Sequence, residues 1–481
     1  MVTKPDLVRL KDIVGDQQLE YCNQCGECTS VCPIARLLDF RPRRIVATVQ
    51  LDMADELLKS DEILLCALCG KCHVCPRKVE LPESFLLLRK PASEQGYLSG
   101  MLSKFVDTLA ILREIIPFPV VYSWLCLRPC EDGSRHGKFD DLVLNVLQNY
   151  LEGREKVAPL PKTRREKIAV LGSGPAGLTA AWELVRMGFP VTVFESLPAT
   201  GGMLRVGIPG YRLPKKVLDV EIENIKNLGV EIRTNKTVDK SLFNNILNGG
   251  EYKATFIAVG AHKSGNLGVE GEDLEGVIYA LDLLRQTNLQ KRAKLGRRAV
   301  VIGGGNVAMD AARTALHYGA EKVQSVCLEC REEMPAHEWE TQEALMEGVV
   351  LNVSWGPKRI LGDGKKVAGV ELIRCVSVFD EKGRFSPSFD ETTTKVLEAD
   401  TVILAIGQAP DLSFLGKEID VLGNTIAVNP ITMETNLLGV FAGGDSVSGP
   451  ASVIEAMVAG KLAAASIDLY LRGMNPVKKT G

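Results

Sequence analysis

From Lys167 onward, short runs of aliphatic and β-branched residues alternate with glycine clusters and alanine-rich segments. Residues 168–194 form one such unit, with an apolar run at each end and a helical stretch between them. Residues 299–328 repeat the pattern. Continuous apolar runs alternating with helices are typical of βαβ units on a parallel sheet. The pattern therefore predicts an α/β fold for this part of the chain.

The preceding region has a different texture. Residues 1–95 hold eight of the thirteen cysteines, and residues 96–165 form a helical connector that ends in a polar linker with two prolines. The most apolar window, residues 109–127, contains two charged residues and is interrupted by two prolines. A membrane-spanning helix needs about 20 nearly uncharged residues. We therefore expect a buried or partner-facing helix here, with no membrane span.

Charge and cysteine content narrow the functional classes. The 481 residues include 57 basic and 60 acidic side chains, a net charge of −3, so no bulk field favours nucleic acid. The chain begins without an apolar signal segment. Thirteen cysteines in such a chain indicate a reducing, cytoplasmic compartment, in which thiols serve as ligands more often than as disulfides.

Eight cysteines form two runs with two- and three-residue gaps, each ending in Cys-Pro. In bacterial ferredoxins three thiolates of such a run bind one iron–sulfur cluster and the fourth binds the other. Two [4Fe–4S] clusters are therefore predicted. By this logic one is held by Cys22, Cys25, Cys28 and Cys75, and the other by Cys66, Cys69, Cys72 and Cys32. Structural zinc is the alternative, but it would not require proline after each run.

Residues 15–90 resemble the helical ferredoxin module of the heterodisulfide reductase C subunit, on the segments DFRPRRIVATVQ and ELLKSDEILLCALCGKC. The chain departs from that family in the gap before Cys75, which has two residues where three are usual. Cys126 and Cys130 resemble part of the iron–sulfur domain of the glutamate synthase small subunit, with Ser134 where a third cysteine belongs. We interpret this pair as a remnant without a cluster. A site completed by a partner chain is the alternative.

Each α/β unit carries a glycine-rich turn between its first apolar run and its helix. In the first, Gly172 permits the tight turn, Gly174 brings backbone to the pyrophosphate and Gly177 lets helix and strand pack closely. Glu195, after the second run, can accept from ribose hydroxyls. The turn that begins at Gly303 repeats the pattern. Two such units imply two bound dinucleotides.

The segments GSGPAGLTAA, TGGMLRVGIPGYRLP, GGGNVAMDAARTA, REEMPAHEWE, AIGQAPD and AGGDSVSGPASVIEA resemble the glutamate synthase small subunit and its relatives, including the N-terminal half of dihydropyrimidine dehydrogenase. This resemblance covers residues 100–475. It implies a two-dinucleotide-binding flavoprotein with an NAD(P)-binding domain, 291–407, inserted into an FAD-binding domain, 166–290 and 408–481. An α-helical ferredoxin-like iron–sulfur domain precedes them.

The same resemblance implies the cofactor contacts. No catalytic side chain is expected, because Glu338 and Glu340 are interpreted as a solvated helix start. Cys327, Cys330 and Cys375 are interpreted as small hydrophobic residues. The FAD contacts are expected at Gly172, Gly174, Pro175, Ala176, Gly177, Glu195, Gly202, Met203, Arg212, Val238, Gly443, Gly444, Asp445 and Ser452. The nicotinamide contacts are expected at Gly303, Gly304, Gly305, Asn306, Val307, Glu329, Ala405, Ile406 and Gly407.

The choice between the two nicotinamide nucleotides depends on one position. Glutamate synthase-type chains commonly place two arginines after the second strand, where they meet the 2′-phosphate of NADPH. Those positions are Leu328 and Glu329 here, with Arg331 still close enough in sequence to serve a phosphate. A carboxylate repels a phosphate, so NAD(H) is expected over NADP(H).

We therefore predict an electron-transfer subunit that moves electrons between NAD(P)H, FAD and two [4Fe–4S] clusters, and exchanges them with a partner redox protein docked near the clusters. The first alternative is a true NADPH-dependent glutamate synthase small subunit. The second is a docking subunit that retains the flavin fold without turnover. A third keeps the cofactors and reverses the flow, reducing NAD⁺ from a low-potential donor such as formate, hydrogen or ferredoxin.

Overall fold

The computed structural model describes residues 19–30, 41–59, 75–79, 158–290 and 293–474, together with seven single residues between 81 and 125. The chain divides into two compact units. The first comprises residues 1–119 and 126–154, and the second comprises residues 120–125 and 155–481. No helix in the described part of the chain combines the length and apolar composition needed to cross a bilayer.

Short helices organise the described part of the first unit. They are η1 (Leu19–Tyr21), α2 (Glu27–Ser30), α3 (Pro42–Gln50) and α4 (Ala54–Lys59). Helix α3 buries Ile45, Val46 and Val49 on one face. Its last residue, Gln50, donates through Nε2 to the carbonyl oxygens of Leu19 (3.0 Å) and Cys22 (3.1 Å). These bonds fix the start of the first cysteine run against α3.

The second unit is built on two parallel sheets. The first sheet has the strand order β17-β4-β1-β2-β3. Its strands and helices are β1 (Lys167–Leu171), α10 (Pro175–Arg186), β2 (Val191–Phe194), α11 (Met203–Val206), α12 (Lys215–Asn227), β3 (Glu231–Arg233), α13 (Lys240–Asn248), β4 (Tyr252–Ile257), β17 (Val440–Ala442), α17 (Asp445–Ser448) and α18 (Val453–Leu471), with the hairpin β15 (Val421–Leu422) and β16 (Thr425–Ile426) before β17.

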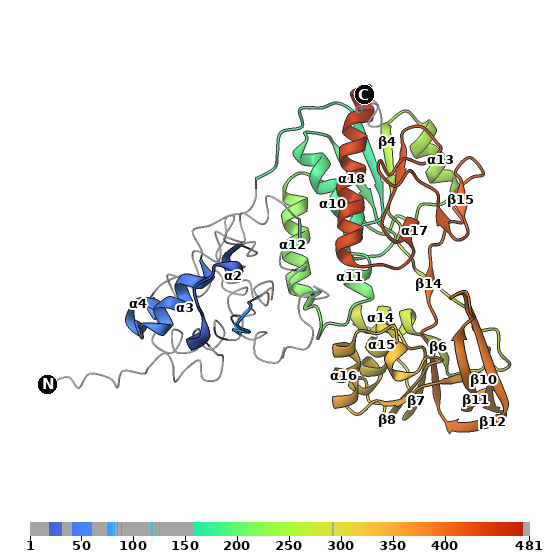
Figure 1. Ribbon diagram of the computed structural model, residues 1–481. Coiled ribbons are helices and arrows are strands. Elements are labelled where there is room, and N and C mark those ends of the chain that lie inside the picture. The colour runs from blue at the N-terminus through green and yellow to red at the C-terminus, as the bar shows by residue number, and fades with distance from the viewer. Residues whose placement is uncertain are drawn as a thin grey trace. The chain divides into compact units, whose positions relative to one another are not determined.

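The central strands of this sheet are buried along almost their whole length, as parallel strands covered on both faces must be. Helices α10 and α18 run side by side (Figure 1). A Cβ atom at Gly460 of α18 would lie 2.4 Å from the carbonyl oxygen of Ala176 in α10. This glycine therefore sets the close spacing of the two helices.

The second sheet has the order β6-β13-β7-β8-β9, also parallel. Its strands and helices are β6 (Val277–Tyr279), α14 (Ala280–Asn288), β7 (Arg298–Ile302), α15 (Asn306–His317), β8 (Lys322–Val326), η4 (Arg331–Glu333), α16 (Glu338–Met346), β9 (Val350–Asn352) and β13 (Thr401–Leu404). Between β9 and β13 the chain forms an antiparallel sheet of β10 (Trp355–Asp363), β11 (Lys366–Phe379) and β12 (Phe385–Glu398).

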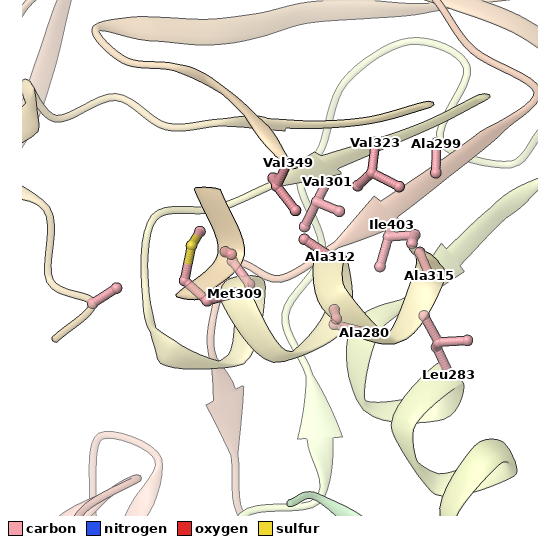
Figure 2. Packing of buried hydrophobic residues seen from close by; sticks show 14 of the residues in the cluster. Ala280, Leu283, Ala299, Val301, Met309, Ala312, Ala315, Val323, Val349 and Ile403 are labelled. Atoms are coloured by element: carbon pink, nitrogen blue, oxygen red, sulfur yellow. The ribbon is translucent and has the colours of Figure 1, made fainter. Parts of the chain in front are cut away.

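The inserted sheet is covered on its two faces in different ways. On one face, Met309, Ala312 and Ala315 of α15 pack with strand residues such as Val301 and Ile403 (Figure 2). On the other face, residues of β10 and β11 pack against Val300, Ile302 and Val326 in a second core. The antiparallel sheet therefore lies against the nucleotide domain where a helical layer would otherwise be expected.

The insertion begins earlier in the chain than residue 291, the start expected from the sequence. Strand β6 and helix α14 belong to the second sheet and its core. The two connections to the insertion pair with each other, as β5 (Lys263–Ser264) and β14 (Gln408–Ala409). The sequence did not reveal this boundary, because β6 has only three residues, all partly buried, and no glycine motif follows it.

Candidate functional site

The first glycine turn joins β1 to α10. Gly172 has φ +104°, and a Cβ there would lie 2.3 Å from the carbonyl oxygen of Ala258. A Cβ at Gly177 would lie 2.0 Å from the carbonyl oxygen of Gly172. Gly174 is the N-cap, Pro175 is the first helical residue, and no side chain caps the helix. The first N–H groups of α10 are therefore left for an anionic group.

Glu195 follows β2 and is 4% exposed. Its carboxylate accepts from the backbone N–H groups of Ser173 (3.0 Å) and Leu197 (2.8 Å) and from the Ser173 hydroxyl. The acid is thus fixed beside the turn before any ribose is present. The Ser196 hydroxyl is a fourth, longer donor, 3.4 Å from Oε1 of the same carboxylate.

Two further segments reach the same helix N-terminus. Gly202 has φ +53°, and a Cβ there would lie 2.6 Å from the Cα of Gly174. A Cβ at Gly444 would lie 2.9 Å from the Cβ of Ala176. Asp445 follows, and burial raises its pKa to about 6. The structure therefore brings the expected FAD residues of three distant segments together around α10.

Other residues expected at the FAD site lie elsewhere in the domain. Met203 begins α11, and Gly443 donates its N–H to the carbonyl oxygen of Ile257 in β4. Val238 packs on the core beneath β1 and β4. Ser452 caps α18 through a reciprocal pair of bonds with Glu455. Their contacts with FAD stay predictions.

The second glycine turn joins β7 to α15. Gly303 has φ +143°, and a Cβ there would lie 2.3 Å from the carbonyl oxygen of Ala405. Gly305 is the N-cap, again without a side-chain cap. Asn306 accepts through Oδ1 from the backbone N–H of His337 (2.8 Å), which brings the MPAH segment over the turn. Gly407 has φ +104° and follows β13 at the same edge of the sheet.

In the second unit the position in register with Glu195 is Cys327, and the acid Glu329 follows two residues later. Strand β8 ends at Val326, two residues before the predicted end at Leu328. The Oε2 atom of Glu329 lies 3.0 Å from the position that a Cβ on Gly304 would take. Within the described residues no donor bonds this carboxylate. Arg331, which the sequence left open as a phosphate ligand, pairs with Glu338 at 2.7 Å.

A buried ionic cluster joins the two domains. Arg212 pairs with Asp310 of α15 and with Glu340 of α16, both at 2.6 Å. Tyr211 packs edge-on against His317 of α15. Burial raises the pKa of Asp310 to about 6 and that of Glu340 to about 8, although the charge of Arg212 lowers both. Burial outweighs the charges of Arg212 and Arg313, so this site favours the protonated form of each carboxyl group more than water does.

The cluster corrects one interpretation of the sequence. Glu338 lies at the start of α16 and is solvent-exposed, as expected, but Glu340 is 2% exposed. This burial could not be predicted from the sequence, because the partner Arg212 is more than a hundred positions away. Arg212 was expected to contact FAD, and that contact stays a prediction.

The first unit contains a pocket lined by four of the predicted cluster ligands, Cys22, Cys25, Cys28 and Cys75, together with Arg43 and Val46. The grouping of Cys75 with the first run is the one expected from the ferredoxin pattern. In the described residues no three acidic, cysteine or histidine side chains are arranged to hold a single metal ion. Cys32, Cys66, Cys69, Cys72, Cys126 and Cys130 lie outside the described residues.

The cysteines of the nucleotide domain differ in exposure. Cys327 and Cys375 are buried, and Cys330 is partly exposed. Burial raises the pKa of Cys327 to about 12, which leaves its thiol protonated. Its Cβ would lie 2.8 Å from a Cβ on Gly304. Cys327 therefore packs against the second turn, a contact that no motif in the sequence predicted.

The residues present fit the implied cofactors. Each turn leaves an uncapped helix N-terminus beside an acid, with no room for side chains at its glycines, which suits a dinucleotide pyrophosphate and ribose. Four thiols around one pocket suit an iron–sulfur cluster, whose ligands stand further apart than those of one metal ion.

Comparisons with known proteins identify a family for each of the two regions. Residues 166–460 match the family model described as pyridine nucleotide-disulphide oxidoreductase. Residues 21–80 match the model of a 4Fe-4S dicluster domain.

Among individual relatives, the chain is 40% identical over 402 residues to the NADP(+)-dependent formate dehydrogenase subunit beta of Moorella thermoacetica, which covers 77% of this chain and 57% of that one. It is 33% identical to the NADPH-Fe(3+) oxidoreductase subunit beta of Geobacter sulfurreducens, over 94% of this chain and 77% of the relative. It is 34% identical to the glutamate synthase [NADPH] small chain of Escherichia coli, over 64% of this chain and 70% of the relative. The chain thus spans little more than half of the first relative.

Proposed function

The chain belongs to the pyridine nucleotide-disulphide oxidoreductases and carries a 4Fe-4S dicluster domain before them, and on this premise we propose that it is an electron-transfer subunit. It moves electrons between NAD(P)H, FAD and two [4Fe–4S] clusters. A partner redox protein, docked near the clusters, delivers or removes them.

The four-cysteine pocket carries this proposal. A flavoprotein of this fold needs no iron–sulfur ligands to oxidise a nicotinamide nucleotide. Cys22, Cys25, Cys28 and Cys75 around one pocket therefore add a second redox function to the chain. Clusters transfer single electrons, and a partner protein is the natural acceptor or donor for them. The printed names of two relatives, each a beta subunit, support a complex with further subunits.

The chain's own residues contribute position and charge. The uncapped N-termini of α10 and α15 hold the two pyrophosphates, and Glu195 and Glu329 meet the adenosine riboses. FAD, when bound, supplies the hydride chemistry with the nicotinamide. The buried cluster of Arg212, Asp310 and Glu340 holds the two domains together.

Three finer points belong to the same proposal. Glu329 favours NAD(H), whereas the relatives named for NADP(H) favour the phosphorylated nucleotide, so the choice turns on what else surrounds the adenosine ribose. The direction of flow follows the partner: a low-potential donor would drive reduction of NAD(P)⁺. The cysteine-rich cluster module supports a reducing, cytoplasmic location.

Anaerobic purification with iron, sulfide and flavin quantitation tests the proposal, followed by titration with NADH and NADPH. About eight irons and one FAD per chain, both reduced by nucleotide, are expected. Zinc in place of iron, or flavin that neither nucleotide reduces, would contradict the proposal and favour a docking subunit.

Single cysteine variants test the ligand assignment. Cys22→Ser and Cys66→Ser should each lower the iron content by about four atoms, the content of one cluster. Cys126→Ser is the matched control and should leave iron unchanged. Loss of iron in the Cys126 variant would mean that the Cys126–Cys130 pair holds a third site.

A true glutamate synthase small subunit is the second candidate, favoured by the 34% identity to the Escherichia coli small chain. Glutamate formation from 2-oxoglutarate and glutamine, measured after mixing with a glutamate synthase large subunit, distinguishes it. Restored activity would support this candidate over a different partner.

A further inference from the structure

Three side chains of the antiparallel sheet meet beside the second dinucleotide turn. They are Trp355 of β10, Arg374 of β11 and Lys395 of β12. The backbone N–H of Trp355 donates to the carbonyl oxygen of Cys327 (2.9 Å), and that of Ser354 to the carbonyl oxygen of Glu329 (2.8 Å). The sheet is therefore tied to the residues that follow β8, where the adenosine ribose of a dinucleotide lies.

The two cations share one aromatic ring. The Lys395 Nζ lies 4.2 Å from the centre of the Trp355 indole, and the Arg374 guanidinium carbon lies 5.5 Å from it. Trp355 and Arg374 are directly opposite in the β10–β11 ladder, which places them on one face of the sheet. Lys395 also donates to Asn352 Oδ1 at 2.8 Å, at the end of β9.

Neither cation has an acidic partner within the described residues. Asp390 stands opposite Arg374 in the β11–β12 register, but its carboxylate accepts from Thr392 and Thr393. Burial and the charge of Arg374 both lower the pKa of Lys395. Two like charges kept together in this way cost free energy that a bound anion would offset.

Glu329 lies close to the same place. Ser354 links it to the sheet: the Ser354 N–H donates to the carbonyl oxygen of Glu329, and the N–H of Cys375, next to Arg374, donates to the carbonyl oxygen of Ser354 (3.0 Å). Arg331 is already paired with Glu338 and cannot serve the same anion without breaking that pair. The unpaired cations at the adenosine end are thus Arg374 and Lys395.

We propose that Arg374 and Lys395, held over Trp355, form a subsite for the 2′-phosphate of NADP(H), while Glu329 accepts from the remaining ribose hydroxyl. The assignment rests on the proposed function, since it requires the second glycine turn to bind a nicotinamide nucleotide. It makes the chain competent for NADPH despite the acid at position 329. The antiparallel sheet contains no glycine motif that would mark it in the sequence. In this proposal it determines the specificity for NADP(H).

The test uses adenosine 2′,5′-bisphosphate and 5′-AMP as probes, measured by calorimetry on the full chain. The double variant Arg374→Gln/Lys395→Gln should bind the bisphosphate at least about tenfold more weakly, because each charge-assisted bond is worth roughly a factor of ten. Binding of 5′-AMP should not change. The kcat/KM for NADPH in flavin reduction should fall by a similar factor, with that for NADH unchanged.

Lys358→Gln/Arg359→Gln is the matched control, because these residues lie on the same sheet and pair with Glu371. It should leave both probes unaffected. Equal weakening of both probes, or no weakening of either, in the Arg374/Lys395 variant would overturn the subsite. Wild-type protein that binds neither probe would overturn the nucleotide site itself, and so separates failure of the proposed function from failure of this inference.

Discussion

In the first dinucleotide unit the acid after the second strand is held by donors of the protein, whereas in the second unit the corresponding acid has no such donor among the described residues. Glu195 accepts from Ser173 and Leu197. The Oε2 atom of Glu329 lies 3.0 Å from the position that a Cβ on Gly304 would take. The turns share their backbone geometry, because Gly172 and Gly303 make equally close approaches to carbonyl oxygens. The contrast teaches that the turn specifies a dinucleotide, while the neighbours of the acid decide which one.

A second contrast lies in the helices. The third glycine of the first turn, Gly177, has its counterpart in Ala308, which is fully buried. Two positions further on, Thr179 of α10 corresponds to Asp310 of α15. Asp310 faces Arg212 of the other domain. Helix α15 thus leaves room for the Ala308 methyl group and directs Asp310 toward the other domain. Helix α10 has a glycine and a threonine at these positions.

The largest effect is expected from exchanging the third turn position. Gly177→Ala would place a Cβ 2.0 Å from the carbonyl oxygen of Gly172, which overpacks the turn by about 1–3 kcal/mol or more. FAD content should fall to a small fraction of the wild-type value, measured by absorbance after gel filtration. Ala308→Gly is the matched control. It should lower helix stability by about 1 kcal/mol and leave nucleotide binding unchanged. Full FAD content in Gly177→Ala would refute the steric account.

The acids should respond differently to the same change. Glu195→Gln removes a buried charged acceptor of several donors and should lower stability by about 2 kcal/mol, with weaker FAD binding. Glu329→Gln should barely change the melting temperature, and should raise the ratio of kcat/KM for NADPH over NADH by relieving repulsion of the phosphate. Thermal melts and flavin-reduction kinetics measure both. Equal destabilisation by the two variants would erase the contrast between the units.

A smaller, pH-dependent effect is expected at Asp310 and Glu340. Burial raises the pKa of Glu340 from its ordinary 4.5 to about 8, so the folded state retains a proton that the unfolded chain releases. This stability is complete below about pH 4.5 and is lost progressively as the pH rises from there through 8. The charges of Arg212, Arg313, Glu343 and Asp310 all act on this group.

The measurement compares melting temperatures of wild type and Glu340→Gln from pH 5 to pH 8. The variant should gain on the wild type as the pH rises, because its amide carries no titrating proton. Glu338→Gln, at an exposed ion pair on the same helix, is the control and should follow the wild type. Parallel curves for wild type and Glu340→Gln would show that no proton is retained there.

The sequence predicted what depends on local sterics. Both turns could be recognised, because only glycine fits where a Cβ would meet a carbonyl oxygen. The ferredoxin spacing rule predicted that Cys75, from the second run, belongs with Cys22, Cys25 and Cys28 of the first. Cys75 lines the same pocket as these three cysteines. Its role as a ligand stays a prediction. The nested order of the two domains followed from the position of the segments around β4 and β17.

What depends on distant packing could not be predicted. Arg212 meets Asp310 and Glu340 only because the fold brings the turn before α12 close to α15 and α16. Glu340 follows a proline turn, and Glu338, Thr341 and Gln342 beside it are polar, so the sequence around it was interpreted as a solvated helix start. Trp355, Arg374 and Lys395 lie on three strands with no motif of their own. These three side chains come together because of the pairing register of the strands, which the sequence does not specify.

The nesting of one domain in the other has a consequence for the order in which the chain can fold during synthesis. The nucleotide sheet uses strands from one continuous stretch, from β6 to β13. The FAD sheet is complete only when β17 pairs with β4, and α10 is covered only when α18 arrives. Since a chain emerges from the ribosome N-terminus first, the inserted domain can close while the outer one still lacks its last strand. The domain that begins earlier in the gene is therefore the later one to be finished.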